Sequence, residues 1–270
     1  MKRLLKIEWL KLKNSKAFII IGGFYILCLS LVTYGMGSFE VTAGSDEGLK
    51  TTLNLGKLGV FDFPYIWQNI TYIAGFFKYI LAILVVIFIC NEYTYRTVRQ
   101  NVIDGLSRRE FITSKLLTIL SFSVVSTALT VLITVILGGI FSNNRAMDVI
   151  LLKTDFVLAY FLEVSVYLIF SFFVASLIKR TGFVIITLVL YTFVIEPIAV
   201  WQIGEPIGDW LPIQSIREMS ELPFKRYAKD IIDLDIMENA GVSAMFRTLL
   251  YGLGFSWLTY YLFSKRDILS

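Results

Sequence analysis

The sequence contains no histidine, and this absence argues against several classes of function. Histidine is the usual zinc ligand and the side chain whose charge changes near neutral pH, so a zinc enzyme or a histidine-based pH switch is not expected. The two cysteines, Cys28 and Cys90, lie in apolar runs and lack the spacing of a metal site. We therefore predict no metal site, no catalytic residues and no cofactor bound by this chain.

Charged residues are also scarce. They make up 17% of the 270 residues, whereas hydrophobic residues make up 56% and the mean hydropathy is +0.71. A soluble domain contains about 25% charged residues and could not bury so much apolar surface in its own core. Much of the surface must therefore face lipid, and we predict an integral membrane protein.

Six segments are apolar over about 20 residues, the length that a helix needs to cross the hydrocarbon core of a bilayer. No internal repeat or low-complexity linker separates them. We expect an all-α fold with six transmembrane helices, in a single domain over residues 1–270 whose first span is retained. The predicted spans are Ala17–Met36, Ile70–Cys90, Leu116–Phe141, Phe156–Ile178, Phe183–Ile203 and Val242–Phe263.

Basic residues are concentrated in every second connecting segment. They gather at the N-terminus, in the loop after the second span, in the link after the fourth span and at the C-terminus. The alternate segments are neutral or acidic, and residues 204–241 carry eight acidic side chains against four basic ones. Because basic segments stay in the cytoplasm, both termini are predicted to be cytoplasmic.

Residues 1–16 favour an amphipathic helix that lies in the membrane interface. Leu5, Trp9 and Leu12 recur at helical spacing, and lysines surround them. Such a helix buries its apolar side at the headgroup level, where tryptophan is well suited. The alternative is a charged flank that only sets the topology, and the two interpretations are compatible.

The cytoplasmic loop at residues 92–113 has clear helix boundaries. Thr97 and Gln100 have the spacing of a capping box, and Ser107 and Glu110 have it again. The first pair predicts a short helix between the second and third spans, and the second pair predicts the start of the third span's helix. The alternative is a basic loop with ordinary caps that only sets the topology.

This loop carries a resemblance to a known family. Its pattern E-Y-x-x-R-T-x-R-Q-N-x-x-x-G-x-S-R-x-E-F-x-x-x-K, over Glu92–Lys115, resembles the coupling-helix region of ABC-2 type permeases. The basic N-terminal helix, the six spans and the F-x-x-x-D ending at Phe263 to Asp267 are similar as well. The resemblance implies a permease in the bacterial cytoplasmic membrane.

The resemblance also implies partners. Two permease subunits, identical or homologous, pair with two ATPase subunits that bind ATP and Mg²⁺, and no nucleic acid is involved. The chain itself has no G-x-x-x-x-G-K-[ST] motif, so we expect ATP hydrolysis in the partners and no enzyme activity here. The candidate ATPase-docking residues of the coupling helix are Glu92, Arg96, Thr97, Arg99, Gln100, Asp104, Gly105, Ser107 and Arg108.

Four ionisable side chains lie within predicted spans, and such residues are functional candidates by default because a charge in lipid is costly. They are Lys78, Glu163, Glu196 and Arg247. Counted along the helices, all four fall roughly 8–12 Å below the outer surface. One interpretation is an ion-pair network that lines or closes the transport pathway. The other is that the bases extend to the headgroups while the acids contact water.

Residues 197–241, which begin with Pro197 after the acidic Glu196, favour a re-entrant helical segment at the outer face. Prolines interrupt its apolar residues, and irregular backbone at membrane depth is tolerated where protein or water covers it. ABC-2 type permeases are similar here, with re-entrant helices that form an outer gate. The alternative is an interfacial loop anchored by tryptophans.

The leading hypothesis is therefore a permease subunit that exports an amphipathic substrate, which the sequence does not identify. The alternative is a secondary transporter driven by an ion gradient through Glu163 and Glu196, although the sequence lacks the inverted repeat that many such folds have. A signalling or immunity protein that binds without transport is a further possibility. An intramembrane enzyme has no supporting motif.

Overall fold

A computed structural model describes residues 2–37, 40–43, 51–54, 59–95, 97, 100, 107–143, 146–223 and 237–265 of the chain. Nearly all of these residues are helical. The exception is a small antiparallel hairpin in which strand β1 (Glu40–Ala43) pairs with strand β2 (Thr51–Asn54). The predicted helical membrane fold is thus confirmed in its main feature, and the hairpin is an addition to it.

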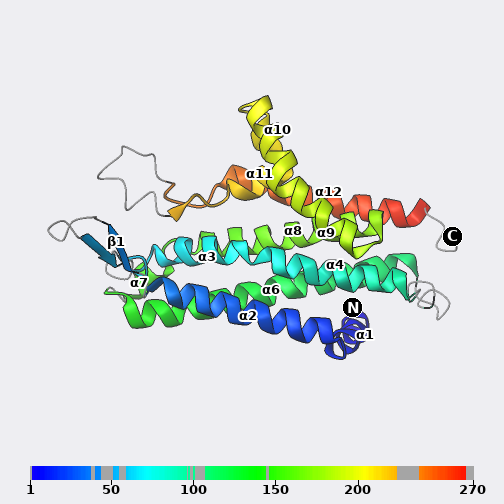
Figure 1. Cartoon of the computed structure of the whole chain (residues 1–270), viewed down its shortest axis with the longest axis horizontal. Coiled ribbons are helices and arrows are strands. Elements are labelled where there is room, and N and C mark those ends of the chain that lie inside the picture. Colours follow the sequence, from blue (N-terminus) through cyan, green and yellow to red (C-terminus); the bar gives the residue numbers. More distant parts are fainter. Residues whose placement is uncertain are drawn as a thin grey trace.

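Long helices run side by side along the molecule (Figure 1). The second predicted span consists of two helices that meet at Phe77, and the third begins well before Leu116. The long helices of the bundle are α2 (Lys16–Gly37), α3 (Ile66–Phe76), α4 (Lys78–Thr94), α6 (Arg108–Phe141), α8 (Asp155–Ile178) and α12 (Val242–Lys265).

Helix α8 lies at the centre of this bundle and contacts α3, α4, α6 and α12. Its sequence is apolar on all sides, which is typical of a helix surrounded by other helices or by lipid. Tyr160, Tyr167 and Phe172 are among the largest fully buried side chains of the protein. On α12, Gly252 allows close packing against α8, because a Cβ there would lie 2.9 Å from a methyl group of Val166.

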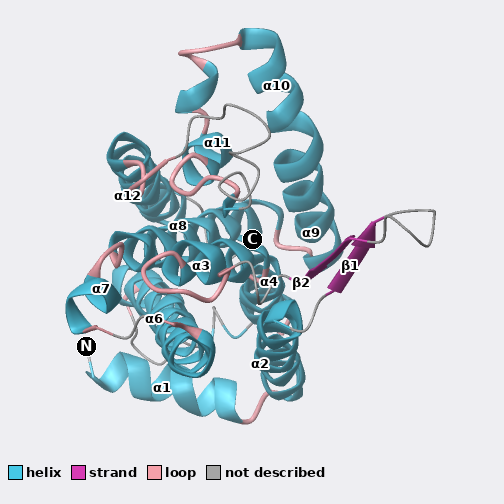
Figure 2. Ribbon diagram, turned by 90° about the vertical axis from the view of Figure 1, so that its left-hand side faces the viewer, coloured by secondary structure: helices cyan, strands magenta, loops and turns pink. Residues whose placement is uncertain are grey.

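The fifth span leaves the bundle at an angle, as both views show (Figures 1 and 2). It runs from α9 (Thr181–Leu190) through the π-helical turn η1 (Tyr191–Ile195) into α10 (Glu196–Ile203). Proline has no N–H and cannot continue the normal helical ladder, so Pro197 accounts for the local irregularity. The N–H of Glu196 instead bonds to the carbonyl of Tyr191. The fifth span is therefore one continuous helical segment that contains a π turn.

Three short helices complete the described chain. Helix α1 (Lys2–Lys13) precedes the bundle, and α7 (Met147–Leu151) precedes α8. A 3-10 turn, η2 (Gly208–Trp210), and α11 (Pro212–Arg217) bring the chain from α10 back to α12. Helix α11 buries Ile213 and Ile216 and packs against α12. This segment is thus covered by protein.

Within the described residues, five helical segments are long and apolar enough to cross a membrane. Helix α12, with 24 residues, is about 36 Å long and so long enough, but it is less apolar than the others. The sixth span therefore stays a prediction. The five segments are Lys16–Gly35, Ile66–Thr94, Arg109–Phe141, Met147–Ile178 and Thr181–Ile203.

The two ends of the bundle differ in what they carry (Figure 1). Helix α1, the C-terminal end of α12, the turn between α8 and α9 and the helix ends that flank residues 96–106 lie together at one end, here called the α1 end. The strands and α7 lie at the other, here called the hairpin end. The basic segments that the sequence places on one side of the membrane thus share one end of the molecule.

Candidate functional site

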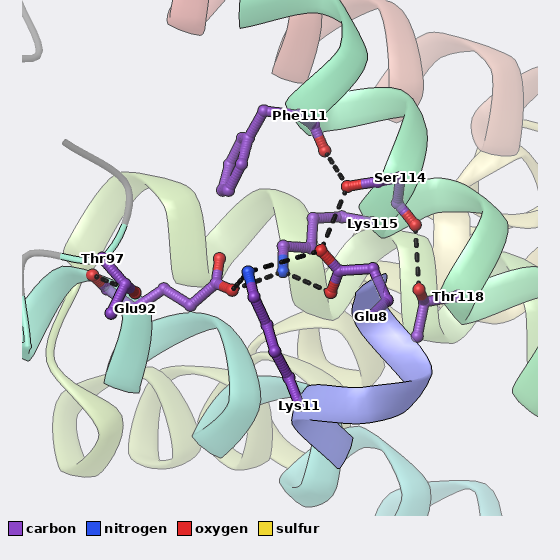
Figure 3. A network of polar contacts seen from close by, with 8 residues as sticks. All are labelled: Glu8, Lys11, Glu92, Thr97, Phe111, Ser114, Lys115 and Thr118. Carbon is purple, nitrogen blue, oxygen red and sulfur yellow. Dashed lines mark hydrogen bonds and ion pairs between the residues drawn. The ribbon is translucent and has the colours of Figure 1, made fainter. Parts of the chain in front are cut away.

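Four charged side chains meet inside the α1 end, and we call them the three-helix ion cluster: Glu8 and Lys11 of α1, Glu92 of α4 and Lys115 of α6. Figure 3 shows Lys115 between the two glutamates. Its Nζ lies 2.6 Å from Glu8 Oε2 and 2.6 Å from Glu92 Oε1. Lys11 Nζ lies 3.1 Å from the same Glu92 oxygen. The cluster thus joins three helices that are far apart in the sequence.

Local structure explains why these side chains meet. Helix α6 begins at a complete capping box, in which the Ser107 hydroxyl accepts a hydrogen bond from the Glu110 N–H and the Glu110 carboxylate accepts one from the Ser107 N–H. This confirms the second capping box predicted from the sequence. The capping box sets the residue at which α6 begins and so the position of Lys115 along this helix. The neighbouring Ser114 Oγ lies 3.3 Å from a Glu8 oxygen.

Three members of the cluster are buried, which decides its energetics, while Lys11 is partly exposed. The Lys115 side chain is fully covered, and its ammonium also lies 4.3 Å from the centre of the Phe88 ring. Ion pairs in such surroundings gain from the low dielectric constant, but removing one partner leaves a buried charge uncompensated. Glu92 Oε2 is buried and has no hydrogen-bond partner among the described residues. The contact between the three helices therefore depends on Glu8, Glu92 and Lys115.

The structure gives Glu92 a position different from the one expected of a docking residue. Its residue surface is only 6% exposed, so its carboxylate faces the bundle and not an exposed docking surface. Thr97 donates a hydrogen bond from its hydroxyl to the Glu92 carbonyl, 3.2 Å away, and Ser107 caps α6. Gln100 is exposed.

The other predicted docking residues lie outside the described residues. These are Arg96, Arg99, Asp104 and Gly105, together with the side chain of Arg108. The predicted short helix that begins at the capping box of Thr97 and Gln100 lies outside them as well. The docking surface therefore stays a prediction.

Sequence reasoning missed Glu8. The lysines of residues 1–16 favoured the prediction of a helix at the membrane surface. Glu8, however, lies on the apolar side of this helix, between Leu5 and Leu12. An acidic residue on the buried side of an amphipathic helix needs a partner, because burying an unpaired charge is very costly. That position was the available signal. Helix α1 is confirmed, but Glu8 turns it toward the bundle.

A second ion pair lies within the spans. Lys78, at the start of α4, is 2.6 Å from Glu163 of α8, and both side chains are largely buried. Gly75 makes room for this carboxylate, since a Cβ there would lie 2.8 Å from a Glu163 oxygen. The Lys78 ammonium also lies 4.8 Å from the centre of the Tyr79 ring. Two of the four predicted intramembrane charges are therefore paired.

The other two predicted charges bind elsewhere, so the four do not form one network. Glu196 Oε1 accepts hydrogen bonds from the N–H groups of Ile213 and Gln214, at 2.6 and 2.7 Å, and so caps α11. Arg247 of α12 pairs with Glu218, just beyond α11, and donates to the carbonyl of Asp209 at 2.9 Å. Both charges thus act on the short segment between α10 and α12.

The segment that follows Pro197 is held from two sides. Arg217, at the end of α11, donates a hydrogen bond to the carbonyl of Thr192 in η1, at 2.8 Å. The Thr192 hydroxyl in turn lies 3.1 Å from the Tyr167 hydroxyl of α8. Residues 224–236 of the predicted gate region lie outside the described residues. The described part connects the outlying fifth span to the bundle.

Buried charges that join helices of a multi-pass bundle define the class: a polytopic helical membrane protein with polar contacts between its spans. Comparison with known families is more specific. A family model described as ABC-2 family transporter protein matches residues 4–196, which is more than half of the chain and includes the whole three-helix ion cluster. The chain belongs to the ABC-2 transporter family, as the resemblance predicted. A search of the curated proteins finds no match.

Proposed function

We propose that this chain is the permease subunit of an ABC-2 type exporter. It forms the pathway for an amphipathic substrate and is driven by separate ATPase subunits, which bind ATP and Mg²⁺. The family match supports the transport role. The observation that carries the coupling is the three-helix ion cluster, which fixes α1, α4 and α6 to one another near the helix ends that flank residues 96–106.

In the proposed mechanism, the ATPases push on residues 92–113. A force on this segment reaches α4 and α6 at their ends, and the ion pairs of Lys115 make these two helices and α1 move together. Coupling between two sites requires an element whose position both sites bias. The capped start of α6 and the ion cluster provide a stiff connection to that element.

At the hairpin end, η2 and α11 form the outer gate in this proposal. Glu196 and Arg217 attach α11 to the fifth span, while Arg247 attaches it to α12. A shift of α10 relative to α12 would move α11, which contacts both, and open the pathway outward. The Lys78–Glu163 pair lies deeper, between α4 and α8, and keeps these spans in register.

The remaining architecture is part of the same proposal. Helix α12 is the sixth span, the α1 end faces the cytoplasm of a bacterial cell, and two permease subunits assemble with two ATPases. The basic segments at the α1 end support this orientation, since lysine and arginine are retained on the cytoplasmic side. The ion-gradient alternative gains no support, because Glu163 already has a lysine partner and Glu196 binds backbone N–H groups.

Affinity purification from the native host tests the proposal. We expect an ATPase subunit to co-purify with the chain, and to be lost from Arg99→Ala or Arg108→Ala. Lys153→Ala, at the hairpin end, is the matched control that retains the ATPase. A chain that purifies alone and shows sodium- or proton-dependent flux without nucleotide would contradict the proposal.

A second measurement tests the coupling. In the complex, hydrogen exchange at residues 208–217 should change when ATP and vanadate are added. Glu8→Gln should keep the ATPase bound but weaken this response, because it removes one carboxylate of the connection. An unchanged response in Glu8→Gln would show that the cluster serves stability alone.

A further inference from the structure

An apolar groove runs along the outside of the bundle beside α1. It has a volume of about 620 Å³ and is walled by α1, α2, α4 and α6. This size lies within the range of roughly 300–1,000 Å³ that is usual for ligand sites. Trp9 packs edge-to-face on Phe18, which stacks on Phe122, so aromatic rings line its wall. The groove is built from the described residues of four separate helices.

The depth of the groove matches one leaflet of a bilayer. Its lining on α6 extends from Thr118 to Leu129, which is about 16 Å of helix rise. Half of a hydrocarbon core about 30 Å thick is of the same length. Helix α2 forms one wall of the groove, and its apolar span is only 17% buried. An acyl chain that enters from the surrounding leaflet would lie parallel to these helices.

Two adjacent glycines leave this space open. Gly22 and Gly23 of α2 both line the groove, and a Cβ added to either would meet no atom within 4 Å. Glycine in the middle of a helix costs about 1 kcal/mol relative to alanine. Larger side chains would fit here without a clash and would favour the helix, yet they would fill the groove.

Two basic side chains lie beside the groove on α1. Lys6 and Lys13 are exposed and lie three and four residues from Trp9, on the same side of α1. Glu8 also lines the groove, but Lys115 pairs with its carboxylate at 2.6 Å. Positive charge on α1 thus lies beside an apolar groove, which is complementary to an anionic headgroup attached to an acyl chain.

We propose that this groove is a binding site for an anionic phospholipid of the leaflet at the α1 end. One acyl chain occupies the space between α1, α2 and α6, and the phosphate group binds near Lys6 and Lys13. The inference rests on the groove and its charges and is independent of the proposed transport function.

Fluorescence of Trp9 provides the test, because this side chain lines the groove. The full chain is placed in phosphatidylcholine nanodiscs that contain a small fraction of either phosphatidylglycerol or phosphatidylcholine with brominated acyl chains, since bromine quenches tryptophan. The Trp9 signal is the difference between the chain and its Trp9→Phe variant. We expect brominated phosphatidylglycerol to quench it at roughly tenfold lower mole fraction than brominated phosphatidylcholine.

Variants separate the groove from the general lipid surface. Gly22→Leu and Gly23→Leu, singly and together, should abolish the selective quenching while the helix is retained. Gly35→Leu is the matched control, because it lies on the same helix in equally open space but does not line the groove. It should leave the quenching unchanged. The combination of Lys6→Gln and Lys13→Gln should make the two brominated lipids equally effective.

Three results would overturn the proposal. Equal quenching by the two lipids in the unmodified chain would mean that Trp9 only contacts bulk lipid. Selective quenching that survives both leucine substitutions would place the lipid outside the groove. Protection of Trp9 from both lipids would mean that protein, such as a second copy of the chain, covers the groove.

Discussion

The α1 end and the α11 region both concentrate charge, but they use it differently. At the α1 end, charged side chains of three helices bind one another, and Lys115 is shared by two carboxylates. Around α11, Glu196 and Arg217 bind backbone groups, and one ion pair joins Arg247 to Glu218. The first arrangement fixes whole helices to each other, whereas the second positions one helix of six residues.

The two kinds of contact should differ in how strongly they resist movement of the helices. Three helices held by shared ion pairs resist separation, because a displaced partner leaves a charge buried without compensation. Helix α11 has only six residues, so a shift of this helix displaces less of the molecule than a separation of α1, α4 and α6 would. Rigid transmission at one end and a movable segment at the other agree with the proposed export mechanism.

The largest expected effect is at the α1 end. Lys115→Met should lower the free energy of unfolding by about 3–5 kcal/mol, because Glu8 and Glu92 stay buried without their shared counter-charge. Thermal unfolding in detergent measures this loss. Neutralising the carboxylates as well, with Glu8→Gln and Glu92→Gln in the same chain, should recover much of the stability. Lys16→Met, an exposed position at the start of α2, is the control.

A smaller loss is expected inside the spans. Lys78→Met should lower the free energy of unfolding by about 1.5–3 kcal/mol, the usual contribution of a hydrogen bond to a charged group. The loss should be smaller than for Lys115→Met because the Glu163 side chain is partly exposed. Adding Glu163→Gln to Lys78→Met should restore part of the lost stability. If the single variant unfolds at the same temperature as the unmodified chain, the pair does not hold α4 against α8.

Variants of Glu196 test the contacts around α11, because the partners of this carboxylate are backbone N–H groups. Glu196→Ala should cost about 0.5–2 kcal/mol, the range for losing a helix cap, and should increase hydrogen exchange at residues 212–217. Glu196→Gln should retain most of the protection, because its amide oxygen can accept the same hydrogen bonds. Equal loss in both variants would mean that the charge matters more than the cap.

The smallest effect concerns pH. Burial raises the pKa of the Glu218 carboxyl, an effect that Asp209 adds to and that Gln214 and Arg247 offset only in part. A raised pKa in the folded state favours the protonated form. Glu218 therefore contributes stability below the pKa of an unfolded glutamate, about 4.3, and this contribution is lost as the pH rises through the folded value.

Glu218→Gln removes this dependence. Unfolding temperatures measured between pH 4 and pH 7 should then change less with pH than those of the unmodified chain. The pH-dependent part of the free energy of unfolding that Glu218 contributes should stay below about 1 kcal/mol, because the Glu218 carboxyl is only partly buried and solvent screens its charge. A steeper pH dependence in the variant would contradict the assigned sign.

Much of the fold was predictable because local patterns carry it. Apolar runs predicted the five spans that are apolar enough to cross a membrane, and Ser107 with Glu110 predicted the start of α6. The candidate site was less predictable. Glu92 was expected on a docking surface and lies inside, while Glu8 was missed. The pairing of charged side chains depends on how each helix is rotated about its axis, and a short sequence pattern does not predict this rotation.

The sequence alone determined the membrane environment, the helical spans and the gathering of basic residues at one end, since each follows from composition or from residues close together in the chain. Only the tertiary structure decided that Lys115 joins Glu8 to Glu92 and that Glu196 caps α11. The physical reason is distance along the chain: these partners are brought together by packing, and packing depends on the whole bundle.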